Sequence, residues 1–176
     1  MQTYSKILDL GCGVGRDSAY FAKSGHKVVA TDLSEEVIEQ NKKYFSGLEI
    51  DFRVSDLSGN YPFEENSFDL VYAYLSLHYF NDETTKKIIK EIHRVTKPEG
   101  YLVFSCKTVF DPHYGKGKEI EKDMFLPSDG HVRHFFSEEY ANEILNSKFQ
   151  IISLKIVEEV YDSEKSSILQ CIARKV

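Results

Sequence analysis

The chain has 176 residues, a length that fits one domain with a substantial buried core. Hydrophobic residues make up 41% of it and aromatic residues 13%, a composition that argues against wholesale disorder. The net charge of −6 disfavours long-range attraction of bulk nucleic acid, and no apolar run is long enough to span a membrane. Three widely spaced cysteines, Cys12, Cys106 and Cys171, suit free thiols in a reducing cytosol, so we expect a cytoplasmic protein.

Short apolar runs alternate with stretches of helical period, which predicts strand–helix–strand units around a mainly parallel sheet. Five strands are expected first, over Lys6–Leu10, Lys27–Thr31, Asp51–Val54, Phe68–Tyr72 and Tyr101–Ser105. Helices are expected over Arg16–Ser24, from Ser34 to Phe45, and over Glu83–Thr96. Ser34 is a typical helix N-cap, and Pro98 and Gly100 are expected to stop the third helix.

The last part of the chain departs from this alternation. Residues 108–136 are expected to form an irregular insert, after which Ser137 caps a helix. Phe149–Val160 and Ser167–Arg174 are expected to be strands joined directly through the polar turn Asp162–Ser166. Because no helix separates these two strands, the sheet is predicted to end in an antiparallel hairpin.

The strongest local signal is the glycine loop Leu8-Asp9-Leu10-Gly11-Cys12-Gly13-Val14-Gly15 after the first strand. Alternate glycines permit a tight turn, and the loop opens a helix whose free amides are expected to face a ligand. The dinucleotide fingerprint needs a third glycine where this chain has Arg16, and the P-loop lysine is also absent. Asp9 and Asp17 bracket the loop and would repel a pyrophosphate. The loop therefore favours a cationic, phosphate-free nucleoside over NAD.

Further side chains follow the next strands, at the edge where ligands of such sheets bind. Asp32 ends the second strand and is placed to accept two hydrogen bonds from a ribose diol. Asp56 follows the third strand and is suited to an exocyclic amine, with the apolar Leu57 beside it. The segment Tyr74–Phe80 follows the fourth strand. Each acid also has a plainer interpretation, Asp9 and Asp56 as turn residues and Asp32 as a helix cap.

Several segments carry a family resemblance over nearly the whole chain: Ile7–Gly15, Asp32–Ser34, Asp56–Leu57, Phe68–Val71, Leu77–Tyr79 and Arg94–Leu102. In order and spacing they are similar to the class I S-adenosylmethionine-dependent methyltransferases. The resemblance implies an α/β fold, a Rossmann-like doubly wound sheet of seven strands, mostly parallel with a C-terminal antiparallel hairpin. It implies one such domain over residues 1–176. The family usually has a helix before the first strand, and we expect that this helix is missing here.

The resemblance also implies the chemistry, with S-adenosylmethionine as the cofactor and methyl transfer to an acceptor as the reaction. It implies that Asp9, Gly11, Cys12 and Gly13 hold the methionine portion of the cofactor, and that Gly15 lets the cofactor approach closely where the helix begins. Asp32 would bind the ribose, and Leu33, Asp56 and Leu57 would contact the adenine. Tyr74 would lie near the sulfonium.

Candidates for a base or for orienting the acceptor are His78, Tyr79 and His131, with His113 and His134 as further possibilities. No metal site is expected from the histidines of the insert, since no cysteine or dense carboxylate cluster accompanies them. The 108–136 insert is expected to cover the active site and form the acceptor pocket, the alternative being a purely structural role.

The acceptor is expected to be a small molecule for two reasons. The motif of amino-directed nucleic-acid methylases does not follow the fourth strand, and the sequence contains no dedicated recognition domain. Two other functions stay open. An NAD-dependent oxidoreductase would share the scaffold but lacks support from the loop, and a non-catalytic cofactor- or protein-binding module would keep the site without turnover. The sequence gives neither the identity of the acceptor nor the oligomeric state.

Overall fold

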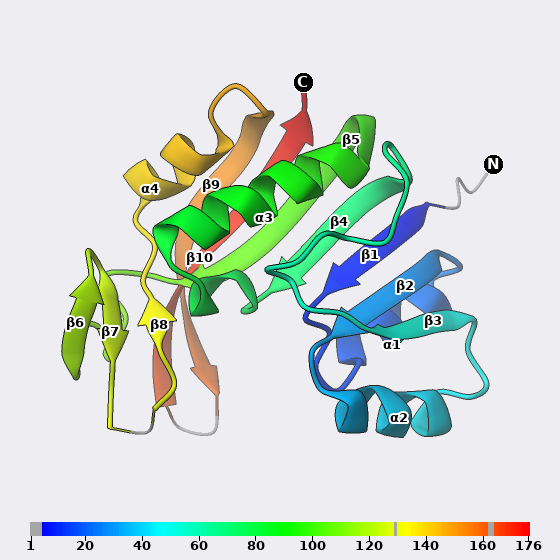
Figure 1. Cartoon of the computed structure of the whole chain (residues 1–176), viewed down its shortest axis with the longest axis horizontal. Helices are drawn as coiled ribbons and strands as arrows, with labels where there is room; N and C mark the ends of the chain where they lie inside the picture. The colour runs from blue at the N-terminus through cyan, green and yellow to red at the C-terminus, as the bar shows by residue number, and fades with distance from the viewer. Residues whose placement is uncertain (1–4, 129, 162–163) are drawn as a thin grey trace.

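The computed structural model describes residues 5–128, 130–161 and 164–176. In this part of the chain, four α-helices and a 3-10 turn accompany a seven-stranded sheet (Figure 1). Asp129 of the insert and residues 162–163 of the predicted polar turn lie outside the described residues, as do residues 1–4.

The strands of the large sheet are β1 (Lys6–Leu10), β2 (Lys27–Asp32), β3 (Ile50–Val54), β4 (Phe68–Tyr74), β5 (Thr96–Lys107), β9 (Phe149–Tyr161) and β10 (Glu164–Lys175). Their order is β3-β2-β1-β4-β5-β10-β9. The first five pair in parallel, and β10 is antiparallel to both β5 and β9. The predicted mostly parallel, seven-stranded sheet with a closing antiparallel hairpin is confirmed.

Helices cover both faces of the sheet. They are α1 (Arg16–Lys23), α2 (Glu35–Tyr44), α3 (Asp82–Val95) and α4 (Glu138–Leu145). Ile38 of α2 packs with Val28, Ala30 and Phe52 on one face, while α3 and α4 pack over the larger core on the other face. Figure 1 shows α3 and α4 in front of the sheet and α1 behind it. Among the described residues, no helix is long and apolar enough to cross a membrane.

Local cap chemistry places the helix starts where the sequence predicts them. The Ser34 side chain accepts a hydrogen bond from the Val37 amide, and Ser137 accepts one from the Tyr140 amide. Both bonds satisfy an otherwise unpaired donor in the first helical turn. Asn81 caps α3 in the same way, and this cap moves the helix start one residue ahead of the predicted one.

The fifth strand is longer than predicted. Pro98 and Gly100 do not follow a helix end in a loop, because α3 already stops at Val95 and β5 runs from Thr96 to Lys107. The pairing of β4 with β5 shifts register between Phe68 and Leu70, opposite this stretch. Such an irregularity tolerates a proline, which has no amide to donate to a regular ladder.

The insert is also more ordered than predicted. Instead of an irregular stretch, it contains a three-stranded antiparallel sheet of β6 (Lys118–Glu121), β7 (Met124–Leu126) and β8 (Arg133–His134). Tyr114, Phe125 and Phe135 pack edge to face with ring centroids 5.1–6.1 Å apart. Aromatic packing therefore gives this small sheet a core of its own.

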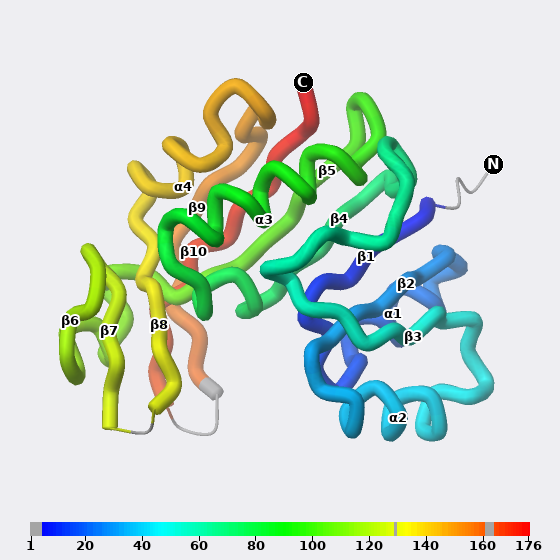
Figure 2. The backbone as a smooth tube through the Cα atoms, in the orientation of Figure 1, coloured from blue at the N-terminus to red at the C-terminus, as the bar shows by residue number. Residues whose placement is uncertain are grey.

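The segments that follow the parallel strands all begin at the same edge of the sheet. Figure 2 shows β4 between β1 and β5, and because these strands pair in parallel, the glycine loop, the η1 turn (Leu77–Tyr79) and the insert follow them at the same edge. This carboxyl edge is where the predicted site residues gather.

Candidate active site

The glycine loop follows β1 and owes its shape to packing as well as to backbone freedom. Gly11 has a φ of 73°, and a Cβ there would lie 2.5 Å from the Ser76 Cβ. Gly13 has a φ of 49°, and a Cβ there would meet no described atom within 4 Å. Gly11 is thus fixed by the neighbouring chain, while Gly13 borders open space in which a ligand can approach the backbone.

Several backbone amides of this loop donate hydrogen bonds to other groups of the protein. The Gly11 and Cys12 amides both donate to the Thr31 carbonyl oxygen at 2.8 Å, and the Gly13 amide donates to Asp32 at 2.9 Å. These three loop amides are engaged within the protein, while the prediction that the free amides at the start of α1 face a ligand stays a prediction. These three residues therefore hold no spare amide donor for a ligand.

Asp9 is the most perturbed acid at this edge. It is 2% exposed, and one carboxylate oxygen accepts a hydrogen bond from the Ser18 hydroxyl at 2.5 Å. Burial raises the pKa of Asp9 to about 7, and the negative charges of Asp17 and Asp32 raise it as well. A positively charged ligand group would relieve both effects. Asp9 is therefore suited to hold an amino cation.

Asp32 lies at the end of β2, half-buried, with both oxygens engaged. It accepts hydrogen bonds from the Gly13 amide at 2.9 Å and from the Ser34 amide at 3.0 Å. Each carboxylate oxygen keeps a second acceptor position, so a diol can still bind. The neighbouring Leu33 is 68% exposed, an apolar side chain left uncovered beside this acid. The ribose and adenine roles of these two residues stay predictions.

The residues after β3 fit their predicted role less closely. Asp56 is exposed and accepts hydrogen bonds from the amide and the hydroxyl of Ser58, both at 2.8 Å. This is the plainer interpretation of Asp56, a side chain that closes its own turn. Leu57 is 6% exposed and packs into the core, so its side chain does not present the expected face to a ligand. The adenine contacts of both residues remain predictions.

Tyr74 ends β4 and is paired across the sheet edge. Its hydroxyl donates to Glu159 at 2.8 Å, and Glu159 also accepts from Gln170 at 3.3 Å. Partial burial, followed by the bond to Glu159, raises the pKa of Tyr74 to about 12. Sequence reasoning missed Glu159, which follows another acid, Glu158, in strand β9 and belongs to no motif.

The structure brings two of the three catalytic candidates together. His78 is 1% exposed, and its ring lies 4.5 Å from that of Tyr79, which is 50% exposed. The Nδ1 atom of His78 has no hydrogen-bond partner among the described residues. Burial lowers the pKa of His78 to about 3, and the charges of Lys107 and Arg133 lower it too. His78 is therefore a neutral imidazole near neutral pH.

The other histidines of this region take different places. His131 is exposed in the segment before β8. His113 lies 3.0 Å from the Asp111 carboxylate, and the Nδ1 atom of the buried His134 lies 3.1 Å from the Phe80 carbonyl oxygen. In the part of the chain that the structure describes, no three histidine, cysteine, aspartate or glutamate residues are arranged to hold a metal.

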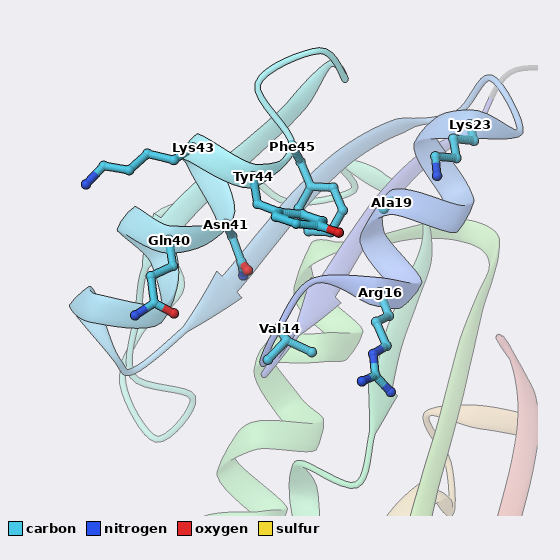
Figure 3. A pocket seen from close by; sticks show the side chains of 9 residues that line it. All are labelled: Val14, Arg16, Ala19, Lys23, Gln40, Asn41, Lys43, Tyr44 and Phe45. Atoms are coloured by element: carbon cyan, nitrogen blue, oxygen red, sulfur yellow. The ribbon is translucent and has the colours of Figure 1, made fainter.

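A wide hollow of about 910 Å³ lies behind the glycine loop rather than at the strand ends. Figure 3 shows Asn41 pointing from α2 toward the loop, where its amide donates to the Gly13 carbonyl oxygen at 2.7 Å. The aromatic residues Tyr44 and Phe45 lie between α1 and α2. Neither Asp9 nor Asp32 lines this hollow, so it does not coincide with the predicted cofactor site.

A glycine turn lined by acids at the carboxyl edge of such a sheet is typical of α/β proteins that bind nucleosides. Comparison with known proteins identifies the family within this class. A family model described as a methyltransferase domain matches residues 7–100, more than half of the chain. A demethylmenaquinone methyltransferase of Clavibacter sepedonicus is 34% identical over 149 residues, covering 82% of this chain and 58% of that protein. A tRNA N(3)-methylcytidine methyltransferase of Drosophila melanogaster is 28% identical over 145 residues, covering 76% of this chain and 45% of that protein.

The fold comparison agrees with the sequence comparison. The solved structure of an S-adenosylmethionine-dependent methyltransferase from Methanosarcina mazei matches with a TM-score of 0.87 and 25% identity, covering 100% of this chain and 94% of that one. The chain belongs to the methyltransferase domain family, of the S-adenosylmethionine-dependent type. It spans 58% or less of the two curated relatives named above, whose acceptors differ, so membership leaves the acceptor to be argued from this chain.

Proposed function

We propose that this protein transfers a methyl group from S-adenosylmethionine to a small-molecule acceptor in the cytoplasm. The observation that carries the proposal is the grouping of Asp9, Asp17 and Asp32 at a glycine turn whose own amides are occupied. Carboxylates without free amide donors select a cation and repel a phosphate. A nucleoside bearing an ammonium and a sulfonium group fits that chemistry.

The donor set also fits the individual parts of this cofactor. Asp9 and Asp17 would hold the amino group, Asp32 would accept from the ribose hydroxyls, and the open face of Gly13 would admit the ligand to the backbone. When bound, S-adenosylmethionine supplies an electrophilic methyl group on a positively charged sulfur.

The protein's contribution to the reaction is then positioning and charge. Fixing two reactants in line can contribute roughly 7–11 kcal/mol in favourable cases. His78 is held rigidly by burial, and its unpartnered Nδ1 suits it to orient a polar group of the acceptor. Tyr79 and His131 are more exposed and would meet the acceptor from the solvent side. An acceptor that must lose a proton requires a base within hydrogen-bond reach, and Tyr79 and His131 are our candidates, since the low pKa of His78 leaves it an orienting role.

A small acceptor is favoured over a nucleic acid by the charge of the chain. The net charge of −6 gives no long-range attraction for a polyanion. An oxidoreductase using NAD is disfavoured because Arg16 stands where the dinucleotide fingerprint needs its third glycine, and because Asp9 and Asp17 beside the loop would repel a pyrophosphate.

The first test is thermal unfolding with S-adenosylmethionine, S-adenosylhomocysteine, NAD and NADP. A ligand at about 100 times its dissociation constant stabilises by roughly 2.7 kcal/mol, a melting shift of about 5–10 °C at this size. We expect the shift with the two sulfur nucleosides only, and we expect Asp32→Ala to abolish it while Glu49→Ala, an exposed acid before β3, retains it. A shift with NAD alone, or with none of the four, would contradict the cofactor assignment.

The second test follows the methyl group. Labelled S-adenosylmethionine is incubated with a small-metabolite extract or with total tRNA, and we expect label in the metabolite fraction. Label in tRNA would overturn the small-molecule assignment. No transfer to either, despite cofactor binding, would instead favour a non-catalytic module.

A further inference from the structure

The insert contains a cavity that no part of the proposed function yet uses. Its volume is about 330 Å³, a size that suits a small molecule. Three basic side chains border it, His113, Lys116 and Arg133, and no described residue that lines it is acidic. In a chain with a net charge of −6, such a local excess of basic groups stands out against the acidic average.

The remaining walls are apolar. Phe125, Pro127 and Phe135 line the cavity, and the rings of Phe125 and Phe135 are 6.1 Å apart. Phe135 is 1% exposed and Phe125 is 7% exposed, so these rings are held in place by packing. A ligand that matches both kinds of wall has an apolar, ring-sized body and a negatively charged group.

The backbone that carries His113 and Lys116 is anchored at both ends. Asp111, whose side chain is fully buried, accepts hydrogen bonds from the His113 amide at 2.9 Å and from Lys107 at 3.1 Å. Farther along, Gly117 packs so closely on β7 that a Cβ would lie 2.3 Å from the Leu126 carbonyl oxygen. Both ends of the segment from His113 to Gly117 are therefore anchored, and the cavity is formed before a ligand arrives.

The cavity also lies toward the reacting edge of the sheet. Lys107 is the last residue of β5, next to the strand that ends at Tyr74. The η1 turn that carries His78 packs against both β5 and β8, and Arg133 of β8 lines the cavity. Figure 1 shows the small sheet on the side of the molecule toward which β4 and β5 run. A molecule bound in the cavity would therefore lie on the acceptor side of the proposed site.

We propose that this cavity binds the methyl acceptor through a negatively charged group, a carboxylate or a phosphate monoester, held by His113, Lys116 and Arg133. The inference rests on the proposed methyltransferase function and defines its acceptor class: an anion with an apolar body. The cationic cofactor would bind at the acidic glycine loop and the anionic acceptor at the basic insert, so each is attracted to a different part of one edge.

The test measures binding directly, in the full chain without cofactor. Isothermal titration uses phenyl phosphate and benzoate as anionic probes and benzamide as the neutral probe of similar shape. We expect the anions to bind and benzamide to bind at least about fivefold more weakly, with an affinity for the anions that falls as salt is raised. The stronger of the two anions identifies phosphate or carboxylate as the natural group.

The variant pair is Lys116→Gln and Lys122→Gln. Both remove one positive charge from an exposed position of the insert, but only Lys116 lines the cavity. Lys116→Gln should weaken anion binding at least about fivefold and Lys122→Gln less than about twofold. Equal binding by both variants, or equal binding of benzamide and benzoate, would overturn the inference.

A parallel titration with S-adenosylhomocysteine separates the two proposals. If this nucleoside binds while no anion does, the anionic acceptor class is wrong and the cofactor assignment stands. If the anions bind at the cavity and the nucleoside does not bind, the methyltransferase proposal fails, and with it the interpretation of the cavity as an acceptor site.

Discussion

The two ends of the carboxyl edge differ in charge, yet burial acts on both in the same way. The glycine-loop end gathers Asp9, Asp17 and Asp32, whereas the insert end gathers basic groups around His78. Burial raises the pKa of Asp9 to about 7 and lowers that of His78 to about 3. In each case the low-polarity surroundings favour the neutral form.

Under the two proposals above, this difference would let one sheet edge serve two ligands of opposite charge. At the acidic end the charges of Asp17 and Asp32 add to burial in raising the pKa of Asp9. The basic end contains an imidazole that stays neutral because Lys107 and Arg133 add to its burial. Burying Asp9 and His78 thus has a cost in stability, and that cost is measurable as a pH dependence with opposite sign for the two residues.

The largest expected effect is at Asp9. Its carboxyl has a pKa of 3.8 when unfolded and about 7 when folded, so its contribution to stability is greatest below pH 4 and is lost as the pH rises through 7. We expect Asp9→Asn to raise the free energy of unfolding at pH 8 by roughly 4 kcal/mol, without ligand, and to change it little at pH 4. Urea unfolding at the two pH values measures this, with Asp51→Asn as the surface control. Equal destabilisation at both values would mean that Asp9 is an ordinary structural acid.

The second effect is at His78 and has the opposite sign. Its pKa is 6.5 when unfolded and about 3 when folded, so its contribution is present above pH 6.5 and is lost as the pH falls. Between pH 7 and pH 5 the loss amounts to roughly 2 kcal/mol. His78→Leu should remove that loss, whereas His131→Leu, at an exposed position, should leave it unchanged. Parallel curves for wild type and His78→Leu across this range would contradict the neutral, buried state of His78.

The features that sequence reasoning predicts correctly are those that local rules determine. Ser34 and Ser137 cap helices because a serine oxygen reaches an amide three residues on, whatever the tertiary fold. The strands and the closing hairpin follow from apolar runs and from the missing helix between the last two strands. The glycine loop is legible for the same reason, since its turn requires small residues at fixed spacing.

The features that could not be predicted depend on contacts between distant parts of the chain. The Asp111 carboxylate organises the insert by accepting from the Ser167 amide, 56 residues away, so the insert looks irregular in sequence and is ordered in the structure. The loop amides are occupied by Thr31, a residue of the neighbouring strand with no motif of its own. Glu159 reaches Tyr74 across 85 residues.

The pair of Tyr74 and Glu159 gives the smallest expected effect. Partial burial is the main cause of the raised Tyr74 pKa, and the hydrogen bond to Glu159 adds to it. Glu159→Gln should therefore lower the pKa of Tyr74 from about 12 while leaving it above the ordinary value of 10. Carbon-13 NMR of labelled tyrosine side chains, titrated toward high pH, measures the change, and Glu158→Gln on the exposed side of β9 is the matched control. An unchanged Tyr74 pKa would show that Glu159 does not hold this hydroxyl, and that burial and the charge of Asp17 are the causes of the raised value.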